Sequence, residues 1–381
     1  PPIIGGVETH LTLLGPELVR RGHTVFLLTG AVEGEPVELT FHGVQVKRIP
    51  LMDLNWLAKR GFEDVHREVH GEVEAFLEHA KPELIHAHNL HYFSPLHGRE
   101  LGEQAKRRGV PLVLTAHNVW DDGEFLDLTL GIPWTHIIAV SRFIRQELMA
   151  IGIAESQITV IHHGIDHERL ARATADGRST PKALKGRRII LHPARMGLAK
   201  GNDVSVKAMR LIKQRVPEAM LVMGGTKNII DWTTTQQRDI GYVLHLVKQF
   251  GLTEDVYVDY FTRDDVVSMY AMAEVCIYPS MAGEPFGLTM LESLAAGKPM
   301  IVTDSGGMPE IIQDGVNGYV IRVRDAEALA DRCVRLLTDE ALRARLGRAG
   351  QEMVRDSFTV ERMTDDHEAV YQQCLASYAP A

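Results

Sequence analysis

Short apolar runs alternate with longer amphipathic segments in the first part of the chain. Strands of the buried type are predicted at residues 23–29, 44–49, 84–88, 111–115, 137–140 and 158–161. Helical spacing of apolar residues fills 7–21, 63–80 and the segment up to 108, and Ser141 is predicted to cap a further helix over 142–150. Strands that alternate with helices form a parallel sheet covered on both faces, so a Rossmann-like domain is predicted for 1–163.

A polar stretch then interrupts this pattern. Residues 164–187 contain Gly177, Ser179, Pro181 and Gly186 and predict a linker. The alternation restarts with strands at 189–192, 219–223, 256–259, 275–278 and 300–303, separated by helices at 203–216, 242–250 and 264–272. We therefore predict an α/β protein with a second Rossmann-like, doubly wound domain over 188–364 and ligand in a central cleft, at the carboxyl ends of the strands.

The start of the chain differs from the usual doubly wound pattern. Residues 1–8 look like a loop that enters a helix, and no strand precedes them. Because such a sheet normally opens on a central strand, we expect the first strand to be missing upstream of Pro1.

Length and composition narrow the class of protein. With 381 residues, two domains are expected, and the net charge of −9 argues against a nucleic-acid-binding protein. The three cysteines are far apart, which fits a reduced, cytoplasmic protein without a thiol metal site. No apolar run reaches about 18 residues, so no membrane span is expected. The net acidity also disfavours surface contact with a membrane, for which Lys106-Arg107-Arg108 are the candidate residues.

The stretch from Glu284 to Glu292 carries the first candidate chemistry. Its two carboxylates lie eight residues apart, on either side of the start of a short helix that Gly297 and Pro299 end. Free N–H groups and the helix dipole make such an N-terminus a site for an anion.

A second candidate site follows the strand at 189–192. Arg195 and Lys200 lie in its loop together with Gly197 and Gly201, and two cations on a free backbone suit a diphosphate. A solvated basic loop is the alternative interpretation. The sequence has neither the G-x-G-x-x-G fingerprint nor a P-loop, because Glu292 stands where the P-loop requires its first glycine.

Histidines are numerous in the first half. His86 and His88 share one face of a strand and His91 follows, but no carboxylate or cysteine joins them, so packing and hydrogen bonding are favoured over metal binding. His117 follows the strand at 111–115 and is expected to face the cleft. His162-His163 are expected to shape the hinge.

An acidic loop follows His117-Asn118. Asp121, Asp122, Glu124 and Asp127 have no basic residue between them. The loop is either simply solvated or an acidic rim that attracts a cationic acceptor.

Taken together, these stretches resemble the retaining glycosyltransferases of the GT-B fold, in the large group with an E-x7-E motif that includes bacterial sugar-nucleotide transferases. The resemblance covers nearly the whole chain. It rests on the run Gly5-Gly6-Val7-Glu8-Thr9-His10, on Arg195 and Lys200, on Glu284 through Glu292, and on Gly306-Gly307-Met308-Pro309-Glu310. Val140-Ser141 and Gly164-Ile165-Asp166 match further landmarks of the group, whereas His162-His163 stand where Pro-Asn is more usual.

The resemblance implies roles for the matching residues. Arg195 and Lys200 would hold the donor diphosphate, Glu284 the donor sugar and Glu292 the ribose, while His117 would line the sugar site near the acceptor. The implied catalytic set is His117, Arg195, Lys200 and Glu284. The implied donor site is Gly5, Gly6, Arg195, Lys200, Arg263, Glu284, Phe286, Gly287, Leu288 and Glu292. The implied acceptor site is His117, Asn118, Asp121, Asp122 and Glu124.

The resemblance also implies substrates and domain roles. The first domain would bind the acceptor, the second the nucleotide-sugar, and a final helix within 365–381 would cross back to the first domain. No metal or other cofactor is expected. The donor is expected to be a UDP-sugar, with GDP and ADP as alternatives, and the acceptor a sugar, an amino-cyclitol or a lipid-linked sugar.

Other activities on the same scaffold remain open from the sequence alone. A sugar-nucleotide epimerase or hydrolase, or a phosphorylase, would need acid–base carboxylates or a cofactor lysine placed differently. A non-catalytic sugar-nucleotide-binding protein would have no need to keep Arg195, Lys200, Glu284 and Glu292 together.

Overall fold

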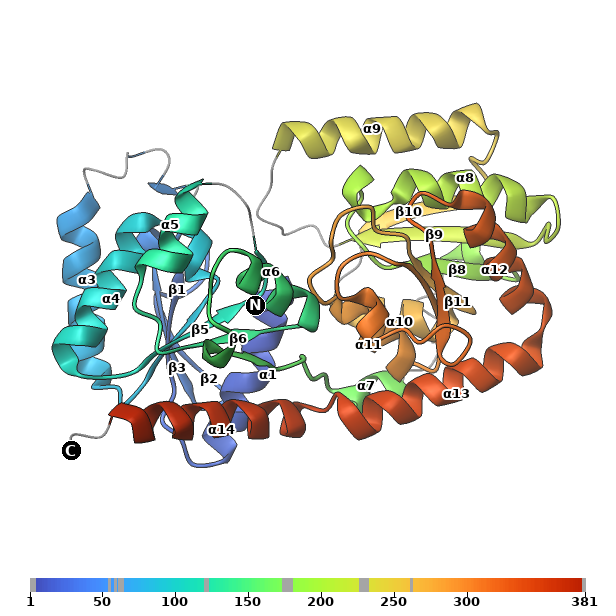
Figure 1. Cartoon of the computed structure of the whole chain (residues 1–381). Coiled ribbons are helices and arrows are strands. Elements are labelled where there is room, and N and C mark those ends of the chain that lie inside the picture. The colour runs from blue at the N-terminus through green and yellow to red at the C-terminus, as the bar shows by residue number, and fades with distance from the viewer. Residues whose placement is uncertain are drawn as a thin grey trace. The chain divides into compact units, whose positions relative to one another are not determined.

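The computed structural model describes residues 5–53, 56–57, 60, 65–119, 123–172, 181–225, 233–260 and 263–378. It divides into two compact units, of which the first comprises Val7–Gly164 and Val360–Ala381 and the second Ile165–Thr359 together with Gly5 and Gly6. Both are built from strands and helices in alternation, and together they form the two Rossmann-like domains of a GT-B fold (Figure 1).

The first unit contains two sheets. One has the strand order β1-β3-β2 and the other β4-β5-β6-β7. Their strands are β1 (Phe26–Gly30), β2 (Glu38–Phe41), β3 (Val44–Ile49), β4 (Ile85–His88), β5 (Leu112–Ala116), β6 (His136–Ala139) and β7 (Ile158–Val160). The helices are α1 (Gly6–Arg20), α3 (His66–Ala80), α4 (Pro95–Arg108), α5 (Gly123–Gly131), α6 (Arg142–Ala150) and α14 (Val360–Tyr378), with short 3-10 turns η1 (Pro50–Met52), η3 (Leu90–Tyr92) and η4 (Glu155–Gln157).

The apolar pattern located most of these elements to within a few residues, but the expected acidic loop after Asn118 is in part helix α5, which contains Glu124 and Asp127. The capping of α6 by Ser141 is confirmed, because its hydroxyl accepts a hydrogen bond from the Ile144 N–H at 3.1 Å. The pattern missed β2, which pairs antiparallel with β3 through a turn at His42 and Gly43, both with positive φ. A four-residue strand with only alternate positions half-buried leaves too short an apolar signal to recognise.

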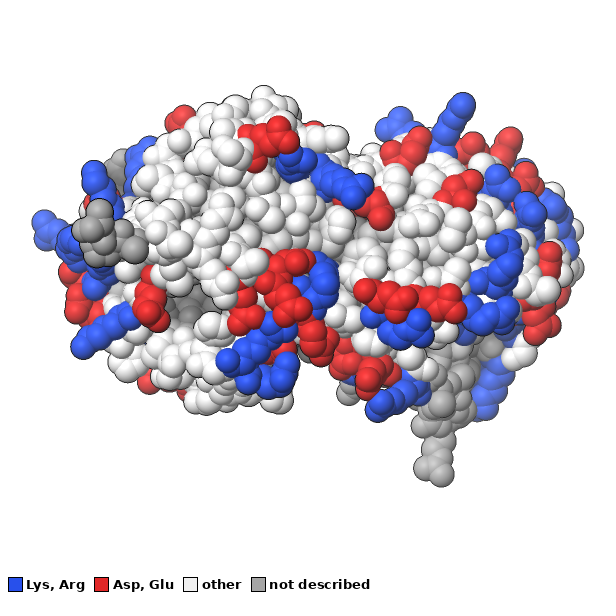
Figure 2. Space-filling model, turned by 60° about the horizontal axis from the view of Figure 1, so that its bottom comes forward, with Lys and Arg blue, Asp and Glu red and all other residues white. Residues whose placement is uncertain are grey.

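The last helix, α14, belongs to the first unit although it ends the chain. It buries Met363, Val370 and Cys374 in an apolar cluster with side chains of α1, β5 and β6. Arg21 fixes the polar side of this contact, with ion pairs of 2.5 Å to Asp365 and Glu368. Figure 2, which brings the α14 side forward, shows basic and acidic side chains interspersed over this face.

The second unit is a single parallel sheet with the order β10-β9-β8-β11-β12-β13. Its strands are β8 (Arg188–His192), β9 (Ala219–Gly225), β10 (Val256–Tyr260), β11 (Val275–Tyr278), β12 (Met300–Thr303) and β13 (Gly318–Ile321). The helices are α7 (His167–Ala171), α8 (Asn202–Lys213), α9 (Thr233–Gln249), α10 (Arg263–Met272), α11 (Leu288–Ala295), α12 (Ala326–Thr338) and α13 (Glu340–Ser357), with 3-10 turns η5 (Lys182–Leu184), η6 (Leu198–Lys200) and η7 (Met308–Glu310).

Helices cover both faces of this sheet. Helices α8, α9 and α12 group on one face, and α7, α10, α11 and α13 on the other (Figure 1). The inner strands β11 and β12 are buried along their whole lengths, so their sequences are continuous apolar runs. The edge strand β10 is more exposed, with Val258 and Asp259 at the surface. In the described part of the chain, no helix is both long and apolar enough to cross a membrane.

Candidate active site

The strand order places a topological switch point between β8 and β11. The chain winds outward from β8 through β9 to β10, then returns to β11 on the other side of β8. In open parallel sheets, ligands bind at the carboxyl ends of the strands on either side of such a point. The loops that leave β8 and β11 there, residues 193–201 and 279–287, contain half of the residues predicted to bind the donor: Arg195, Lys200, Glu284, Phe286 and Gly287.

The two loops are hydrogen-bonded to each other. The carbonyl of Ala199 accepts from the Met281 N–H at 2.9 Å and from the Ser280 hydroxyl at 3.0 Å. Gly201 has a φ of +76°, and a Cβ there would lie 1.8 Å from the carbonyl oxygen of Pro279. The close approach therefore requires glycine at this position, and it holds Lys200 against the second loop.

Lys200, Glu284 and Tyr278 form the centre of this arrangement. The Lys200 ammonium lies 2.7 Å from Oε2 of Glu284, the Tyr278 hydroxyl donates to the same oxygen at 2.6 Å, and Lys200 lies over the Tyr278 ring. Burial alone would lower the pKa of Lys200, but Tyr278 and Glu284 more than offset it and raise that pKa. Burial and the Glu284 carboxylate raise the pKa of Tyr278, so its hydroxyl stays protonated and donates.

Arg195 lies on the same loop and is exposed. No hydrogen bond or ion pair joins its guanidinium to another described residue. It is therefore available to an anion, whereas Lys200 is already held by Glu284.

The backbone of Glu284 is fixed from behind by the glycine pair after β12. The Gly307 N–H donates to the Glu284 carbonyl at 2.8 Å. Gly306 has a φ of +62°, and a Cβ there would lie 2.2 Å from that same carbonyl oxygen. The glycine pair thus allows a close backbone approach, and the group approached is Glu284 itself.

The rest of the E-x7-E stretch forms the start of α11. Gly287 caps this helix with a φ of +85°, Leu288 is its first residue and the Phe286 ring is buried. Glu292 lies one turn into the helix and is half-buried, and the Tyr270 hydroxyl donates to its Oε2 at 2.8 Å. Burial and Glu292 raise the pKa of Tyr270 well above its usual value, which keeps this donor protonated.

Several predicted residues are placed only by their backbone or lie outside the described residues. Arg263 begins α10 and Glu124 lies in α5, but their side chains are not among those described. Asp121 and Asp122 lie outside the described residues. Gly5 and Gly6 form the entry to α1, and Asn118 follows β5, with its carbonyl accepting a hydrogen bond from His91 at 2.9 Å.

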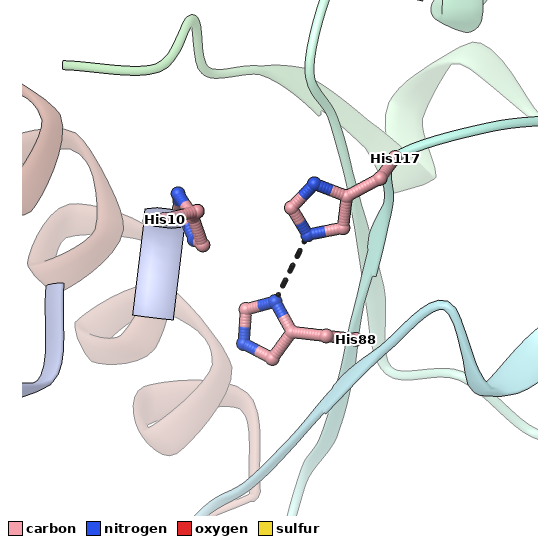
Figure 3. A group of neighbouring side chains, drawn as sticks. All are labelled: His10, His88 and His117. Atoms are coloured by element: carbon pink, nitrogen blue, oxygen red, sulfur yellow. Dashed lines mark hydrogen bonds between the residues drawn. The ribbon is translucent and has the colours of Figure 1, made fainter. Parts of the chain in front are cut away.

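His117 lies at the carboxyl end of β5, inside a cluster of six histidines in the first unit. The other five come from α1, β4, the segment after β7, and α14: His10, His86, His88, His163 and His367. His117 stacks on His163 with ring centroids 5.2 Å apart, and its Nε2 lies 3.2 Å from Nδ1 of His88. Figure 3 shows His10, His88 and His117 converging from α1, β4 and the end of β5.

The sequence identified only part of this cluster. Hydrogen bonding by His86 is confirmed, because its ring nitrogens lie 2.7 Å from the hydroxyls of Tyr371 and Thr115. The sequence does not place His10 or His367 among these histidines, because each is one polar residue in a helical pattern with no other histidine near it in sequence. Their meeting with His88 depends on how α1 and α14 pack on the sheet.

Burial keeps these histidines neutral. It lowers the pKa of His88 and His163 to about 3 and that of His367 to about 4. Burial also lowers the pKa of His117 and His10 well below the usual value, and repulsion from neighbouring rings adds to the effect. At neutral pH the cluster therefore offers uncharged imidazoles, each with one lone pair.

Two family descriptions match successive parts of the chain. Residues 4–169 match "Glycosyltransferase Family 4", and residues 177–353 match "Glycosyl transferases group 1". The chain belongs to this family of glycosyltransferases.

Relatives and solved structures agree with this assignment over nearly the whole length of the chain. The N-acetyl-alpha-D-glucosaminyl L-malate synthase of Bacillus anthracis is 27% identical, over 98% of this chain and 95% of its own. The D-inositol 3-phosphate glycosyltransferase of Nocardiopsis dassonvillei is 26% identical, over 98% and 91%. The structure of Anabaena HepE in complex with UDP-glucose superposes with a TM-score of 0.77 at 18% identity, over 98% and 97%. The enzyme class and the GT-B fold predicted from the sequence are thereby confirmed.

Proposed function

We propose that this glycosyltransferase moves a sugar from a UDP-sugar to an acceptor hydroxyl, with retention of the anomeric configuration and without a metal ion at the diphosphate. The observation that carries the proposal is the 2.7 Å contact of Lys200 with Glu284 at the switch point of the second unit. This contact places a cation that can bind phosphate next to a carboxylate that can bind hydroxyl groups. A sugar diphosphate has both kinds of group.

Arg195 and Lys200 bind the diphosphate in this proposal. Arg195 is exposed and makes no hydrogen bond or ion pair with another described residue, whereas the ammonium of Lys200 has further N–H donors besides the one toward Glu284. Charge builds up on the diphosphate as the sugar leaves, so both cations interact more strongly with the transition state than with the bound donor. They supply the positive charge that a divalent metal supplies in other sugar-nucleotide enzymes.

The two carboxylates bind hydroxyl groups and take no proton. Glu284 accepts from hydroxyls of the donor sugar, and Glu292, oriented by Tyr270, accepts from those of the ribose. The backbone at Phe286, Gly287 and Leu288 offers N–H groups at the start of α11 to sugar or phosphate oxygens. Arg263 flanks the base, and Gly5 and Gly6 let the entry to α1 approach the diphosphate.

The transfer step follows from this arrangement. The acceptor oxygen attacks the anomeric carbon from the face that the nucleotide leaves, so one carbon–oxygen bond forms as the bond to the β-phosphate breaks. The acceptor proton passes to the departing phosphate oxygen, and the products are the glycoside and UDP. No side-chain base is needed in this step, and His117 lines the sugar site.

We propose UDP as the nucleotide of the donor. The Anabaena HepE structure contains UDP-glucose, and UDP is the commonest donor nucleotide in the group of glycosyltransferases that this sequence resembles.

The acceptor is proposed to be a sugar or cyclitol hydroxyl. One relative is named for L-malate and another for D-inositol 3-phosphate, both small and rich in oxygen. His117 and Asn118 would contact this acceptor. The acidic residues Asp121, Asp122 and Glu124 favour an amino-cyclitol within this class.

The test combines ligand binding with turnover. UDP should raise the unfolding temperature more than GDP or ADP, because a ligand at 100 times its Kd adds about 2.7 kcal/mol of stability. Arg195→Ala and Lys200→Ala should each lower the rate of UDP release from UDP-sugars by roughly 100-fold, and the NMR spectrum of the product should show the anomeric configuration of the donor.

The control is Lys207→Ala, which removes a lysine of α8 that pairs with Asp203 at 2.7 Å. It should leave turnover unchanged. Normal turnover in both Arg195→Ala and Lys200→Ala would overturn the diphosphate assignment, and an inverted product would overturn the mechanism.

A further inference from the structure

Three histidines of the first unit come together in a geometry that fits a metal ion. One ring nitrogen each from His10, His88 and His117 lies within 4.8 Å of the others (Figure 3). Nitrogen ligands at about 2.0–2.1 Å around tetrahedral zinc lie roughly 3.3–3.4 Å apart. His88 Nδ1 and His117 Nε2, at 3.2 Å, are already close to this separation, and a movement of about 1.5 Å at most by the His10 side chain would complete the set.

A ring nitrogen of the cluster that has no hydrogen-bond partner in the described part of the chain also favours a bound cation. Nε2 of His10 is buried and has no hydrogen-bond partner among the described residues. A buried nitrogen without a partner costs free energy, and a metal ion at this place would accept the lone pair of His10 Nε2.

A second ring orients His10 in the manner of a metal ligand. Its Nδ1 lies 3.0 Å from Nδ1 of His163. Metal-bound histidines almost always use their other ring nitrogen in such a hydrogen bond, which fixes the tautomer and the ring orientation. His163 can therefore position His10 while the Nε2 of His10 stays free to bind.

The ligand set selects the type of metal. Among the described residues, the group consists of histidines alone, with no carboxylate or thiolate. Imidazole suits zinc, copper, nickel and iron, whereas magnesium and calcium need oxygen ligands. The three free cysteines are buried elsewhere, at Cys276, Cys333 and Cys374.

We propose that His10, His88 and His117 form a site for a zinc-type transition-metal ion within the first unit. The ion links α1 to the ends of β4 and β5 and leaves a fourth position for water or a further ligand. Its ligands belong to the first unit, whereas Arg195 and Lys200 belong to the second. His117 also belongs to the proposed transfer site, so the test uses the other two ligands.

The test measures metal binding by the full-length protein after treatment with a chelator. Zn²⁺ titrated against a chromogenic chelator should bind with one equivalent per chain and raise the unfolding temperature, and Mg²⁺ should do neither. His10→Gln and His88→Gln should each weaken Zn²⁺ binding roughly 10-fold or more. Activity is not needed for this readout, so the result is independent of the proposed transfer reaction.

His136→Gln is the matched control. His136 is a buried histidine on β6 of the same sheet, but its Nε2 pairs with the Thr159 hydroxyl at 2.8 Å, outside the cluster. This variant should bind Zn²⁺ like the unaltered protein.

Co²⁺ provides a second measurement that does not depend on how the variants fold. Bound to the unaltered protein, it should give the visible absorption of tetrahedral nitrogen coordination without a thiolate charge-transfer band. Absence of stoichiometric binding, a thiolate band, or equal Zn²⁺ affinity in folded His10→Gln and His88→Gln variants would overturn the proposal.

Discussion

The ammonium of Lys200 and the carboxylate of Glu284 lie 2.7 Å apart, although 84 residues separate them in the sequence. The contact joins the loop that leaves β8 to the loop that leaves β11, the two strands that flank the switch point. Glu284 is held in this position by Tyr278 and by the backbone N–H of Gly307. Donor binding and local stability should therefore respond to the same substitutions.

Glu284→Gln should lower turnover by roughly 100-fold. The amide keeps the shape of the side chain and can still accept from Tyr278, but it removes the negative charge beside Lys200 and weakens the hold on sugar hydroxyls. The matched control is Glu274→Gln, because Glu274 pairs with Arg188 at 2.6 Å in the same unit. That change should cost about 1 kcal/mol of stability or less and leave turnover intact. Equal losses of turnover in both variants would mean that Glu284 acts only through folding.

Gly306→Ala should displace Glu284 and abolish nucleotide binding. A Cβ at this position would lie 2.2 Å from the Glu284 carbonyl oxygen, and the backbone is left-handed there. We expect a loss of roughly 3 kcal/mol in the free energy of unfolding, measured by urea denaturation.

Gly315→Ala is the control for Gly306→Ala. It measures the cost of a left-handed backbone alone, without a steric clash of the new Cβ. Gly315 has a φ of +74° and no atom within 4 Å of its potential Cβ. This variant should lose only about 1–2 kcal/mol and bind UDP normally. A Gly306→Ala protein that binds UDP as well as the Gly315→Ala protein would contradict the role of Gly306.

Glu292→Gln should weaken UDP binding by about 10-fold, equivalent to about 1.4 kcal/mol. In the proposed function its carboxylate accepts from the ribose hydroxyls, and Tyr270 holds it in place. Calorimetry with a 2′,3′-dideoxy analogue of UDP provides the check, since that analogue lacks both hydroxyls. The dideoxy analogue should bind Glu292→Gln and the unaltered protein with nearly the same affinity. If the variant also binds this analogue 10-fold more weakly, Glu292 does not act through the ribose hydroxyls.

Acidification should destabilise the second unit through His192. Burial lowers the pKa of this ring to about 3 in the folded protein, against 6.5 for an exposed histidine. Between pH 6.5 and 3 the unfolded chain therefore binds a proton that the folded chain does not, and stability falls as the pH falls, by about 1.4 kcal/mol per pH unit. Urea denaturation at pH 8, 6.5 and 5.5 measures this slope.

His192→Asn should flatten the slope. An Asn amide oxygen can take the place of Nδ1, which lies 3.0 Å from the Ser205 hydroxyl, but it does not titrate. An unchanged slope between pH 6.5 and 5.5 in the folded variant would show that other groups control the acid response.

The sequence determined most of the elements and where the candidate donor-binding residues lie along the chain. Strands such as β12, buried on both faces, appear as continuous apolar runs, and Gly297 and Pro299 end α11 by local backbone chemistry. Arg195, Lys200, Glu284 and Glu292 could be found because each lies a few residues after a recognisable strand or at the start of a helix. Parallel strands bring such positions to one edge of the sheet whatever the remaining packing.

The tertiary structure decided which distant side chains meet. Tyr270 and Tyr278 appeared only as apolar positions in a helix and a strand, yet their hydroxyls orient Glu292 and Glu284. His10 and His367 reach the cluster around His117 because α1 and α14 pack on the same sheet, and that depends on buried contacts such as Leu14 and Met363. Local sequence sets the conformation of each segment, whereas the register between segments is fixed by side-chain packing across the core, which no single stretch encodes.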